Sequence, residues 1–459
     1  MGSSNVTPNI DPNLSKRVVI VGFSFAGQQV IQNIAKLDKN KVCQFTVIDK
    51  SDHFEHMPNN FQSFTDPDVF LKQNTISFEK MAAGFSHMLD GRLEFKQARL
   101  TEVLHEENKI EVCHPDGEKT ETVDYDVLCI CTGASYVGAW RGDSDKCDTL
   151  QQRNDEFAQV RDAIAAAKSV LCIGAGDTGL ETAGWLKEQY PDKGVGISMR
   201  GETILKGVKG AHKVAEKILR GMDIQIHYNE AYSAGTSVMY NKDNNEEYGY
   251  YLDCSGLKFK GPTEFFKNSL DFLDKKSNQI LVDKKGRVTN VHPIATQGGN
   301  QTAVVLKNVF SCGDVCLTPA NEVKSIVSMY QYLPAIAINM LNCACDQQPV
   351  AEIPSEFHLL QMIPIGTKNG LMIFNNMVGE DKKIWPQKCE IRDMQIGALN
   401  GEQKWLEKAQ KNAETMPKIF GVASSGCCCC MPIHISKSRK ATQELQKKQK
   451  EEFDNIYKN

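Results

Sequence analysis

The sequence lacks any long hydrophobic run. Nowhere in its 459 residues does an apolar stretch approach the roughly 18 residues that a membrane-spanning helix needs. Residues 1–17 also contain no apolar segment, and Lys16 and Arg17 are their only cations. Neither a secretory signal nor an Arg-rich transit peptide is therefore expected, and a cytoplasmic protein is predicted.

The sequence also lacks an excess of charge of either sign. Its 53 Lys and Arg against 57 Asp and Glu give a formal net charge of −4. Because nucleic-acid binding needs a concentrated basic surface, no nucleic-acid partner is predicted. The 41% hydrophobic and 24% charged residues are typical of an ordinary globular protein. The length predicts two to four domains, at roughly 100–200 residues each.

Cysteine is plentiful but unevenly placed. Without a secretory signal, most of the 16 cysteines are expected to be reduced. Twelve are scattered, and free cysteine in or next to apolar runs packs as a small hydrophobic residue. The exception is a run of four consecutive cysteines, namely Cys427, Cys428, Cys429 and Cys430.

The first strong local pattern lies in residues 16–49. An apolar strand runs into a turn bounded by Gly22 and Gly27, followed by a helix and a second strand that ends at Asp49. This order is typical of a dinucleotide-binding unit, in which a pyrophosphate lies on the free N–H groups at the helix N-terminus. Ser24 replaces the usual middle glycine, and Asp49 has the spacing of an acid that binds a ribose 2′-hydroxyl.

The same pattern recurs about 150 residues later. Gly174, Gly176 and Gly179 form the second turn, with all three glycines in place. Each unit is followed by a short strand that ends in a small hydroxyl residue and a glycine, which indicates a twofold internal repeat. These pairs are Thr132 and Gly133 after the first unit and Ser255 and Gly256 after the second.

Three further segments complete the chain. A strand running into Gly313 and Asp314 precedes a long apolar helix predicted at 323–341. The earlier helices are predicted at 28–37 and 180–188. The fold class is α/β, with two Rossmann-like units, the second inserted in the first, plus a small α+β C-terminal domain and a flexible tail. The predicted boundaries are 15–139 and 258–345 for the first unit, 140–257 for the second, 346–425 for the C-terminal domain and 426–459 for the Cys-rich basic tail.

The motifs together resemble a known superfamily. Two glycine turns, two Thr/Ser-Gly strands and a late Gly-Asp are similar to the flavoproteins with two dinucleotide-binding domains, in which the first unit binds FAD and the inserted second unit binds NAD(P)H. Within it the chain looks most like the ferroptosis-suppressor and apoptosis-inducing-factor-like NAD(P)H:quinone oxidoreductases. The supporting segments are 48–54, 179–183, 188–193, 308–310, the Gly313-Asp314 strand end with Thr318, Pro319 and Lys324, and the turn at 366–370.

Two absences narrow the chemistry that this resemblance implies. Glutathione-reductase-like enzymes need a cysteine pair just after the first unit, and the segment from Asp49 to Thr101 contains no cysteine. Thioredoxin-reductase-like enzymes need Cys-x-x-Cys in the nicotinamide domain, where residues 140–257 offer only isolated cysteines. A disulfide reductase is therefore not expected. Cys312 and Cys316 beside the Gly-Asp pair are interpreted as packing residues.

The resemblance implies a set of FAD-binding residues. Asp314 is expected to bind the ribityl chain, and a helix beginning near Glu322 to direct its positive end at the flavin ring. Thr132 and Gly133 are expected to close over the cofactor. Lys50 and His56 occupy positions where family members contact the flavin. With the first turn, the predicted FAD-binding residues are Gly22, Ser24, Gly27, Asp49, Lys50, His56, Thr132, Gly133, Gly313 and Asp314.

The resemblance also implies a site for NAD(P)H. The second turn and Gly256 are expected to bind it, and Glu181 matches the family's acid beside the nicotinamide, although helical spacing alone fits a solvent-facing Glu equally well. An acid typical of NAD-specific proteins is missing after the second strand, where the chain has Arg200. A coenzyme 2′-phosphate would be paired rather than repelled there, so NADPH is expected to be accepted. Glu181 and Lys324 are the candidate catalytic residues.

The electron acceptor is expected to be a quinone or another small molecule. Its pocket is predicted between the helix that follows Lys324 and the C-terminal domain, with Met329, Tyr330 and Phe374 as candidates, although such residues are often core residues. Two alternatives remain open: a type II NADH dehydrogenase of an organelle membrane, and a catalytically silent flavoprotein fold that serves as a binding subunit. A homodimer is compatible with the resemblance, and no metal is predicted.

The two ends raise the question of a membrane surface. Residues 1–4 begin like an N-myristoylation site at Gly2, but Thr comes only at position 7. The four consecutive cysteines with the basic residues at 437–440 resemble a palmitoylation cluster, and two acyl signals would hold a protein stably on a membrane. A plain disordered tail and a metal site are the alternatives, although four adjacent cysteines do not easily converge on one tetrahedral ion. A peripheral membrane protein is therefore predicted, with lipidation at Gly2, Cys427, Cys428, Cys429 and Cys430.

Overall fold

The structure is a computed structural model. It describes residues 15–115, 117, 119–136, 140, 148–230, 238–241, 246–293, 303–375, 377–405 and 407–408. The predicted lipidation sites all lie outside the described residues, namely Gly2, Cys427, Cys428, Cys429 and Cys430. Among the described helices, none is both long and apolar enough to cross a membrane.

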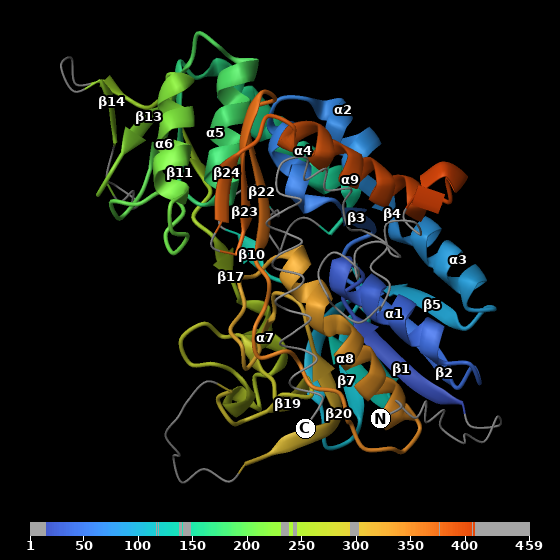
Figure 1. Ribbon diagram of the computed structural model, residues 1–459. Helices are drawn as coiled ribbons and strands as arrows, with labels where there is room; N and C mark the ends of the chain where they lie inside the picture. The colour runs from blue at the N-terminus through green and yellow to red at the C-terminus, as the bar shows by residue number, and fades with distance from the viewer. Residues whose placement is uncertain are drawn as a thin grey trace.

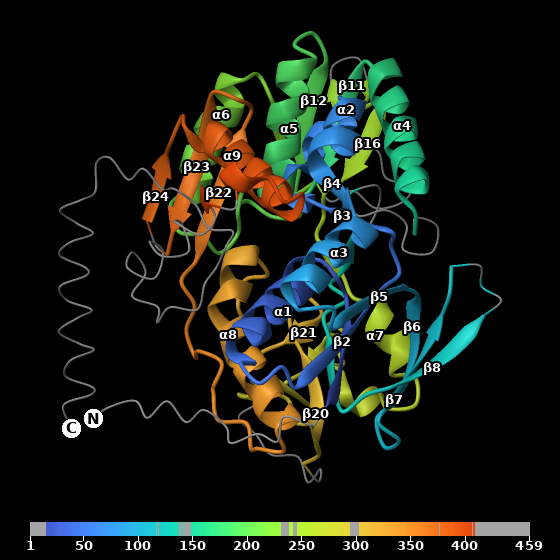
Figure 2. The ribbon, with the colours of Figure 1, turned by 90° about the vertical axis from the view of Figure 1, so that its right-hand side faces the viewer.

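The larger sheet has six strands in the order β19-β20-β9-β1-β2-β5. β1 lies in its centre, parallel to β2 and β9, and its run of Val and Ile is buried on both faces, as a central parallel strand requires. Helices α1 and α8 pack against each other beside this sheet (Figure 2). The bounds are β1 Lys16–Val21, α1 Phe25–Leu37, β2 Cys43–Asp49, β5 Leu93–Gln97, β9 Val127–Ile130, β19 Arg287–Thr289, β20 Val305–Ser311 and α8 Ile326–Ala344.

The second parallel sheet has four strands in the order β13-β12-β11-β16. As in the first sheet, the strand before the glycine turn is an inner strand. This strand, β11, pairs on one side with β12 and on the other with β16, the strand that runs into Ser255 and Gly256. The two sheets therefore share one local topology, as the internal repeat predicts. The bounds are α4 Leu150–Ala166, β11 Ser169–Ile173, α5 Asp177–Gln189, β12 Gly194–Ser198, α6 Ala211–Gly221, β13 Gln225–His227 and β16 Tyr250–Asp253.

A third, antiparallel sheet of β22, β23 and β24 precedes helix α9. It packs on α5, and Figures 1 and 2 show it beside this helix. The contact is close because a Cβ on Gly184 of α5 would lie 2.5 Å from the backbone nitrogen of Gly366. The Glu188 carboxylate also accepts a hydrogen bond from the Thr367 N–H at 2.7 Å. The bounds are β22 Leu360–Ile365, β23 Asn369–Phe374, β24 Met377–Glu380 and α9 Ile384–Leu399.

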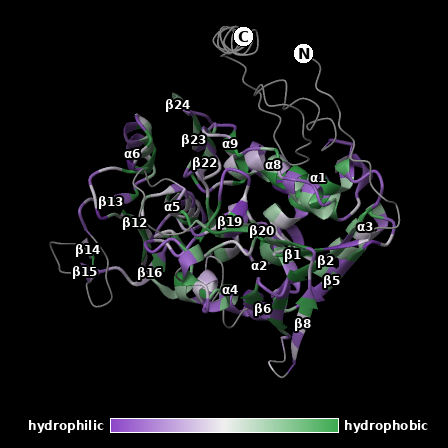
Figure 3. Ribbon diagram, turned by 90° about the horizontal axis from the view of Figure 1, so that it is seen from below, coloured by the Kyte–Doolittle hydropathy of each residue, from purple (hydrophilic) through white to green (hydrophobic). Residues whose placement is uncertain are grey.

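Shorter elements connect these layers. The helical segments are η1 Met57–Phe64, α2 Pro67–Val69, η2 Phe70–Asn74, α3 Phe78–Met88, α7 Gly261–Phe265 and η3 Leu270–Phe272. The remaining strands are β3 His53–Glu55, β4 Thr75–Ser77, β6 Arg99–Leu104, β7 Lys109–Cys113, β8 Thr120–Asp124, β10 Ser135–Tyr136, β14 Met239–Asn241, β15 Glu246–Glu247, β17 Leu257–Lys258, β18 Ile280–Leu281 and β21 Cys316–Leu317. Figure 3 shows hydrophobic and hydrophilic residues mixed along α1 and α6, as in helices with one buried face.

Three predicted helix boundaries were wrong by a few residues. α1 and α5 begin three residues earlier than expected, at Phe25 and Asp177, because the glycine turns lead directly into them. α8 begins later, at Ile326, because Ser325 caps it by accepting a hydrogen bond from the Ser328 N–H. The helix that was expected to begin near Glu322 therefore starts four residues downstream of it.

Candidate functional site

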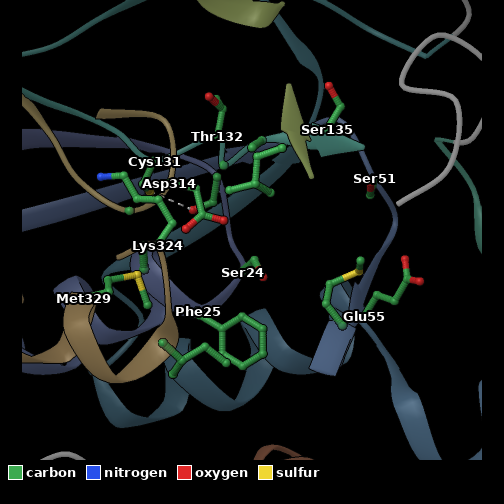
Figure 4. Close-up of a pocket in the computed structure, with 18 of the residues that line it drawn as sticks. Ser24, Phe25, Ser51, Glu55, Cys131, Thr132, Ser135, Asp314, Lys324 and Met329 are labelled. Atoms are coloured by element: carbon green, nitrogen blue, oxygen red, sulfur yellow. Dashed lines mark hydrogen bonds between the residues drawn. The ribbon is translucent and has the colours of Figure 1, made fainter. Parts of the chain in front are cut away.

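One cavity lies between the first glycine turn and the start of α5. Its volume is about 540 Å³, and its wall includes residues of the first turn, of the start of α5 and of the C-terminal elements β22 and α9. Figure 4 shows Asp314, Lys324 and Met329 on one side of the cavity and Ser51 and Glu55 on the other, with Ser24 and Phe25 between them. One space is thus bordered by both predicted cofactor-binding units.

The first turn is built by close backbone contacts. Gly22 has a φ of +110°, and a Cβ there would lie 2.3 Å from the carbonyl oxygen of Cys131. A Cβ on Gly27 would lie 2.0 Å from the carbonyl oxygen of Gly22. Ser24, in contrast, has φ −85° and ψ −155° and makes no capping hydrogen bond with its side chain. This is ordinary extended backbone, so serine takes the place of the middle glycine without strain.

Asp49 lies at the end of β2 and lines the cavity. Its carboxylate accepts hydrogen bonds from the Phe23 N–H at 2.8 Å and the Ser51 N–H at 3.0 Å. Burial raises the pKa of Asp49, and these two hydrogen bonds oppose the shift. The acid therefore fixes the shape of the first turn, in addition to the ribose contact predicted for it.

In the second turn, the backbone packing requires glycine at Gly174 and Gly179 but not at Gly176. A Cβ on Gly174 would lie 2.8 Å from the carbonyl oxygen of Cys254, and one on Gly179 would lie 1.9 Å from the carbonyl oxygen of Gly174. Around Gly176 the described residues place nothing within 4 Å of such a Cβ. The backbone beside Gly176 is thus open at the start of α5, where the sequence predicts a pyrophosphate.

Lys324 and Asp314 line the cavity next to the start of α8. The Lys324 ammonium donates to the Cys316 carbonyl oxygen at 2.7 Å and to the Glu322 carboxylate at 2.7 Å. Burial lowers the pKa of Lys324, but the neighbouring Cys316 and Glu322 outweigh it, so the net shift is upward. This cation is thus held in place by a carboxylate buried behind it.

Glu181 lies on α5 and contacts the C-terminal helix. Its side chain is 6% exposed and pairs with the Lys388 ammonium of α9, and both residues line the cavity. Burial raises the pKa of Glu181 to about 7, although Lys388 opposes the shift. The solvent-facing alternative for Glu181 is therefore wrong. Lys388 was not predicted, because no local pattern links residues 207 positions apart.

His56 and Lys50 also line the cavity. Burial, with Arg392 and Lys388 nearby, lowers the pKa of His56 to about 3, so the imidazole is neutral. Within the described part of the chain, its Nδ1 atom is buried without a hydrogen-bond partner, which fits a polar ligand group in the cavity. Lys50 lies 3.4 Å from the carboxylate of Asp148.

Some predicted residues lie elsewhere. Arg200 is exposed after β12, and the cavity wall does not include Arg200, Gly256, Tyr330 or Phe374, whereas it does include Met329, Thr132, Gly133 and Gly313. The cavity wall also does not include the three glycines of the second turn, Gly174, Gly176 and Gly179. From that unit it includes residues at the start of α5 instead. The structure therefore brings the predicted FAD-binding residues together more closely than those for NAD(P)H.

Three buried cysteines form a cluster under the first turn. The sulfur atoms of Cys129, Cys131 and Cys312 lie within 4.8 Å of one another, a spacing that could hold a metal ion. Hydrogen bonding to Cys129 and burial raise the pKa of Cys131 and Cys312 well above the usual value, and the same hydrogen bonds lower the pKa of Cys129 to about 5. Cys131 donates to the Gly22 carbonyl oxygen at 3.3 Å. Burial raises the pKa of Cys316 to about 12.

Several curated proteins are similar to this chain. Oxidoreductase ptaL of Pestalotiopsis fici is 27% identical over 225 residues, covering 47% of this chain and 57% of that protein. Apoptosis-inducing factor homolog A of Dictyostelium discoideum is 26% identical, covering 39% and 38%. Ferroptosis suppressor protein 1 of Taeniopygia guttata is 24% identical, covering 48% and 54%. The matches thus span between about two fifths and three fifths of these relatives.

Solved structures share the fold over most of the chain. The sulfide:quinone oxidoreductase of Aquifex aeolicus has a TM-score of 0.66 at 15% identity, covering 89% of this chain and 96% of that one. NDH2 of Plasmodium falciparum in complex with NADH has a TM-score of 0.58 at 14% identity, covering 90% and 100%. A family model for pyridine nucleotide-disulphide oxidoreductases matches residues 16–332. The chain therefore belongs to the pyridine nucleotide-disulphide oxidoreductase family, whose members bind FAD and use NAD(P)H.

Proposed function

We propose that this protein passes electrons from NAD(P)H through FAD to a quinone-type acceptor at a membrane surface. The observation that carries the proposal is the single cavity bordered by the first glycine turn, the start of α5 and the C-terminal helix. When bound, FAD accepts hydride from NAD(P)H and passes the electrons on to the acceptor. The protein's own contribution is to bind, orient and polarise these partners.

On the FAD side, the chain offers a positive environment. The turn from Gly22 to Gly27 presents the N-terminus of α1, which favours a pyrophosphate. Lys324 is half-buried, charged and ion-paired with Glu322, so its ammonium would meet the cofactor already held in position. Asp314 is proposed to bind the ribityl hydroxyls. The helix N-terminus and Lys324 would stabilise negative charge on the bound cofactor.

On the coenzyme side, the space at Gly176 is proposed to take the pyrophosphate of NAD(P)H. Arg200, exposed after β12, is proposed to pair with the 2′-phosphate of NADPH. A kcat/KM for NADPH at least equal to that for NADH is expected. A large preference for NADH would contradict this assignment and would favour the type II NADH dehydrogenase alternative.

The acceptor is proposed to be a quinone rather than a disulfide. Among the described residues that line the cavity, Cys131 is the one cysteine, so no redox-active cysteine pair faces it. The wall also includes apolar side chains of α8, β22 and α9, namely Ile326, Val327, Met329, Met362 and Ile391. These apolar side chains would contact a quinone ring, and the polar Gln361 and Lys388 beside them would face its carbonyl oxygens.

The colour of the purified protein tests the proposal most directly. A yellow protein with an absorbance band at about 450 nm that NADPH bleaches is expected. Re-oxidation should be fast with a short-chain ubiquinone analogue and slow with oxidised glutathione. A colourless protein that cannot be reconstituted with FAD would support the catalytically silent alternative. Fast re-oxidation by the disulfide would refute the acceptor assignment.

Membrane association is proposed to depend on acylation of Gly2 and of the four consecutive cysteines, Cys427, Cys428, Cys429 and Cys430. Metabolic labelling with alkynyl myristate and alkynyl palmitate tests the two sites separately. A Gly2→Ala variant should lose the first label only, and a variant with all four cysteines changed to serine should lose the second only. Wild-type protein without either label, and absent from membrane fractions, would refute this part of the proposal.

A further inference from the structure

Asp177 places a second acid, besides Glu181, on the part of the cavity wall that α5 forms. It is the first residue of α5, directly after Gly176, and its side chain lines the same cavity as Glu181, which follows one helical turn later. Residues four positions apart lie on the same face of a helix. Asp177 is half-buried and Glu181 is buried, and two carboxyl groups so placed on one helix face repel each other unless a cation compensates them.

The C-terminal elements hold both acids in place. The Gln361 side-chain amide of β22 donates to the Asp177 carboxylate at 2.7 Å. The Lys388 ammonium of α9 pairs with the Glu181 carboxylate. Above a pH of about 7, where Glu181 is ionised, the two carboxylates and the Lys388 ammonium leave one net negative charge among these three side chains, which is costly away from water unless a positive charge lies nearby.

A simpler role for Asp177 explains less. An acid in the first turn of a helix is favourable because of the helix dipole, and a solvated side chain would serve that purpose. Asp177 instead lines the cavity, its carboxylate is hydrogen-bonded to another layer of the protein, and burial raises its pKa. Its carboxylate would also repel the pyrophosphate that this turn is expected to bind. An acid at this position therefore has to be favourable for another step of the reaction.

We propose that Asp177 is a specificity-determining residue that favours the oxidised, cationic nicotinamide over the reduced, neutral one. The inference rests on the proposed function, because the nicotinamide must meet the flavin in the cavity that Asp177 lines. When the C–H bond at nicotinamide C4 breaks, the hydride leaves for FAD with both electrons, and the ring keeps one positive charge. The unbalanced carboxylate on the α5 wall stabilises that charge.

Nicotinamide binding to the FAD-loaded, full-length protein tests the inference without turnover. The two probes are NADP⁺ and tetrahydro-NADPH, whose ring is neutral and cannot give hydride. Flavin spectral changes at a pH of about 8, above the pKa of Glu181, report both Kd values. For Asp177→Asn, the ratio of the NADP⁺ Kd to the tetrahydro-NADPH Kd should rise about tenfold, or about 1.4 kcal/mol.

Matched variants separate charge from structure. Asp192→Asn removes the same charge from an exposed position after α5 and should leave the ratio unchanged. Asp177→Glu keeps the charge and should hold the ratio within about threefold of wild type. Asp177→Ser removes the charge with a residue tolerated in the first helical turn, which keeps the test available if the Asn variant does not fold.

The outcomes divide cleanly. A higher ratio in the uncharged variants alone supports the inference. An equal loss of affinity for both probes means that Asp177 is a structural residue, and an unchanged ratio means that it does not sense the ring charge; either refutes the inference. If wild-type protein holds no FAD, or NADPH does not bleach it, the proposed function fails first and independently of these ratios.

Discussion

Replacing Gly176 with alanine tests whether the second turn binds a pyrophosphate. Gly176 has φ −84° and ψ −174°, a conformation that alanine adopts freely. The described residues leave the added Cβ without any contact within 4 Å. We therefore expect a change in unfolding free energy of less than about 1 kcal/mol, because reduced flexibility of the unfolded chain offsets the loss of a glycine N-cap.

The same methyl group should damage coenzyme binding. It occupies the space into which a pyrophosphate must move to reach the N–H groups of α5. A loss of one or two hydrogen bonds to charged oxygens, at about 1.5–3 kcal/mol each, predicts at least a tenfold higher Kd for NADPH. Stopped-flow measurement of flavin reduction against NADPH concentration gives that Kd, and FAD content should stay unchanged.

Gly179→Ala serves as the contrasting variant. Its Cβ would lie 1.9 Å from the Gly174 carbonyl oxygen, so the helix must shift and the unfolding free energy should fall by about 1–3 kcal/mol or more. A Gly176→Ala protein that binds NADPH as tightly as wild type would refute the pyrophosphate assignment. One that unfolds as readily as Gly179→Ala would refute the reading that this position serves a ligand.

Three further outcomes are expected. In the folded protein the pKa of Glu181 is about 7, against the ordinary 4.5, so the folded state binds a proton that the unfolded state has lost. The free energy of unfolding should therefore fall by about 3 kcal/mol as the pH rises from about 4.5 to about 7. Urea unfolding of Glu181→Gln should show a flatter pH profile than that of wild type. Ser24→Gly should retain FAD, but its free energy of unfolding should fall by about 0.5–1 kcal/mol. A thermal unfolding scan measures the stability, and cofactor titration measures FAD binding. Lys324→Met should lower the free energy of unfolding by about 3–5 kcal/mol, because it leaves the buried Glu322 carboxylate without a cation. Adding Glu322→Gln to the same protein should recover most of this loss in denaturant unfolding.

Much of the fold was predictable because its signals are local. The apolar run before Gly22 and the one before Gly174 each predict a buried strand that enters a tight turn, and steric contacts within the turns explain the bounding glycines. The place of Asp49 at the end of β2 was also predictable, since its spacing from the turn is short, and its ribose contact stays a prediction. The family and its cofactors follow from these repeated local patterns.

The C-terminal part of the site was not predictable in the same way. Lys388 and Gln361 reach the cavity only because the third sheet and α9 pack on α5. Their partners, Glu181 and Asp177, lie 207 and 184 residues away, and no periodicity or spacing rule connects such distances. Burial of Glu181 depends on this packing too, so helical spacing alone left its environment undecided.

The two turns also show where the internal repeat has diverged. Ser24 and Gly176 share nearly the same φ, −85° and −84°, so the backbone accepts either residue in either unit. The residue that follows differs in polarity between the two turns. Phe25 begins α1 and Asp177 begins α5, and both line the cavity. An apolar ring on the FAD side and a carboxylate on the coenzyme side give the two ends different polarity. On the proposed function, hydride transfer moves charge between the two cofactors, and Asp177 is the member of this pair that we propose responds to the change.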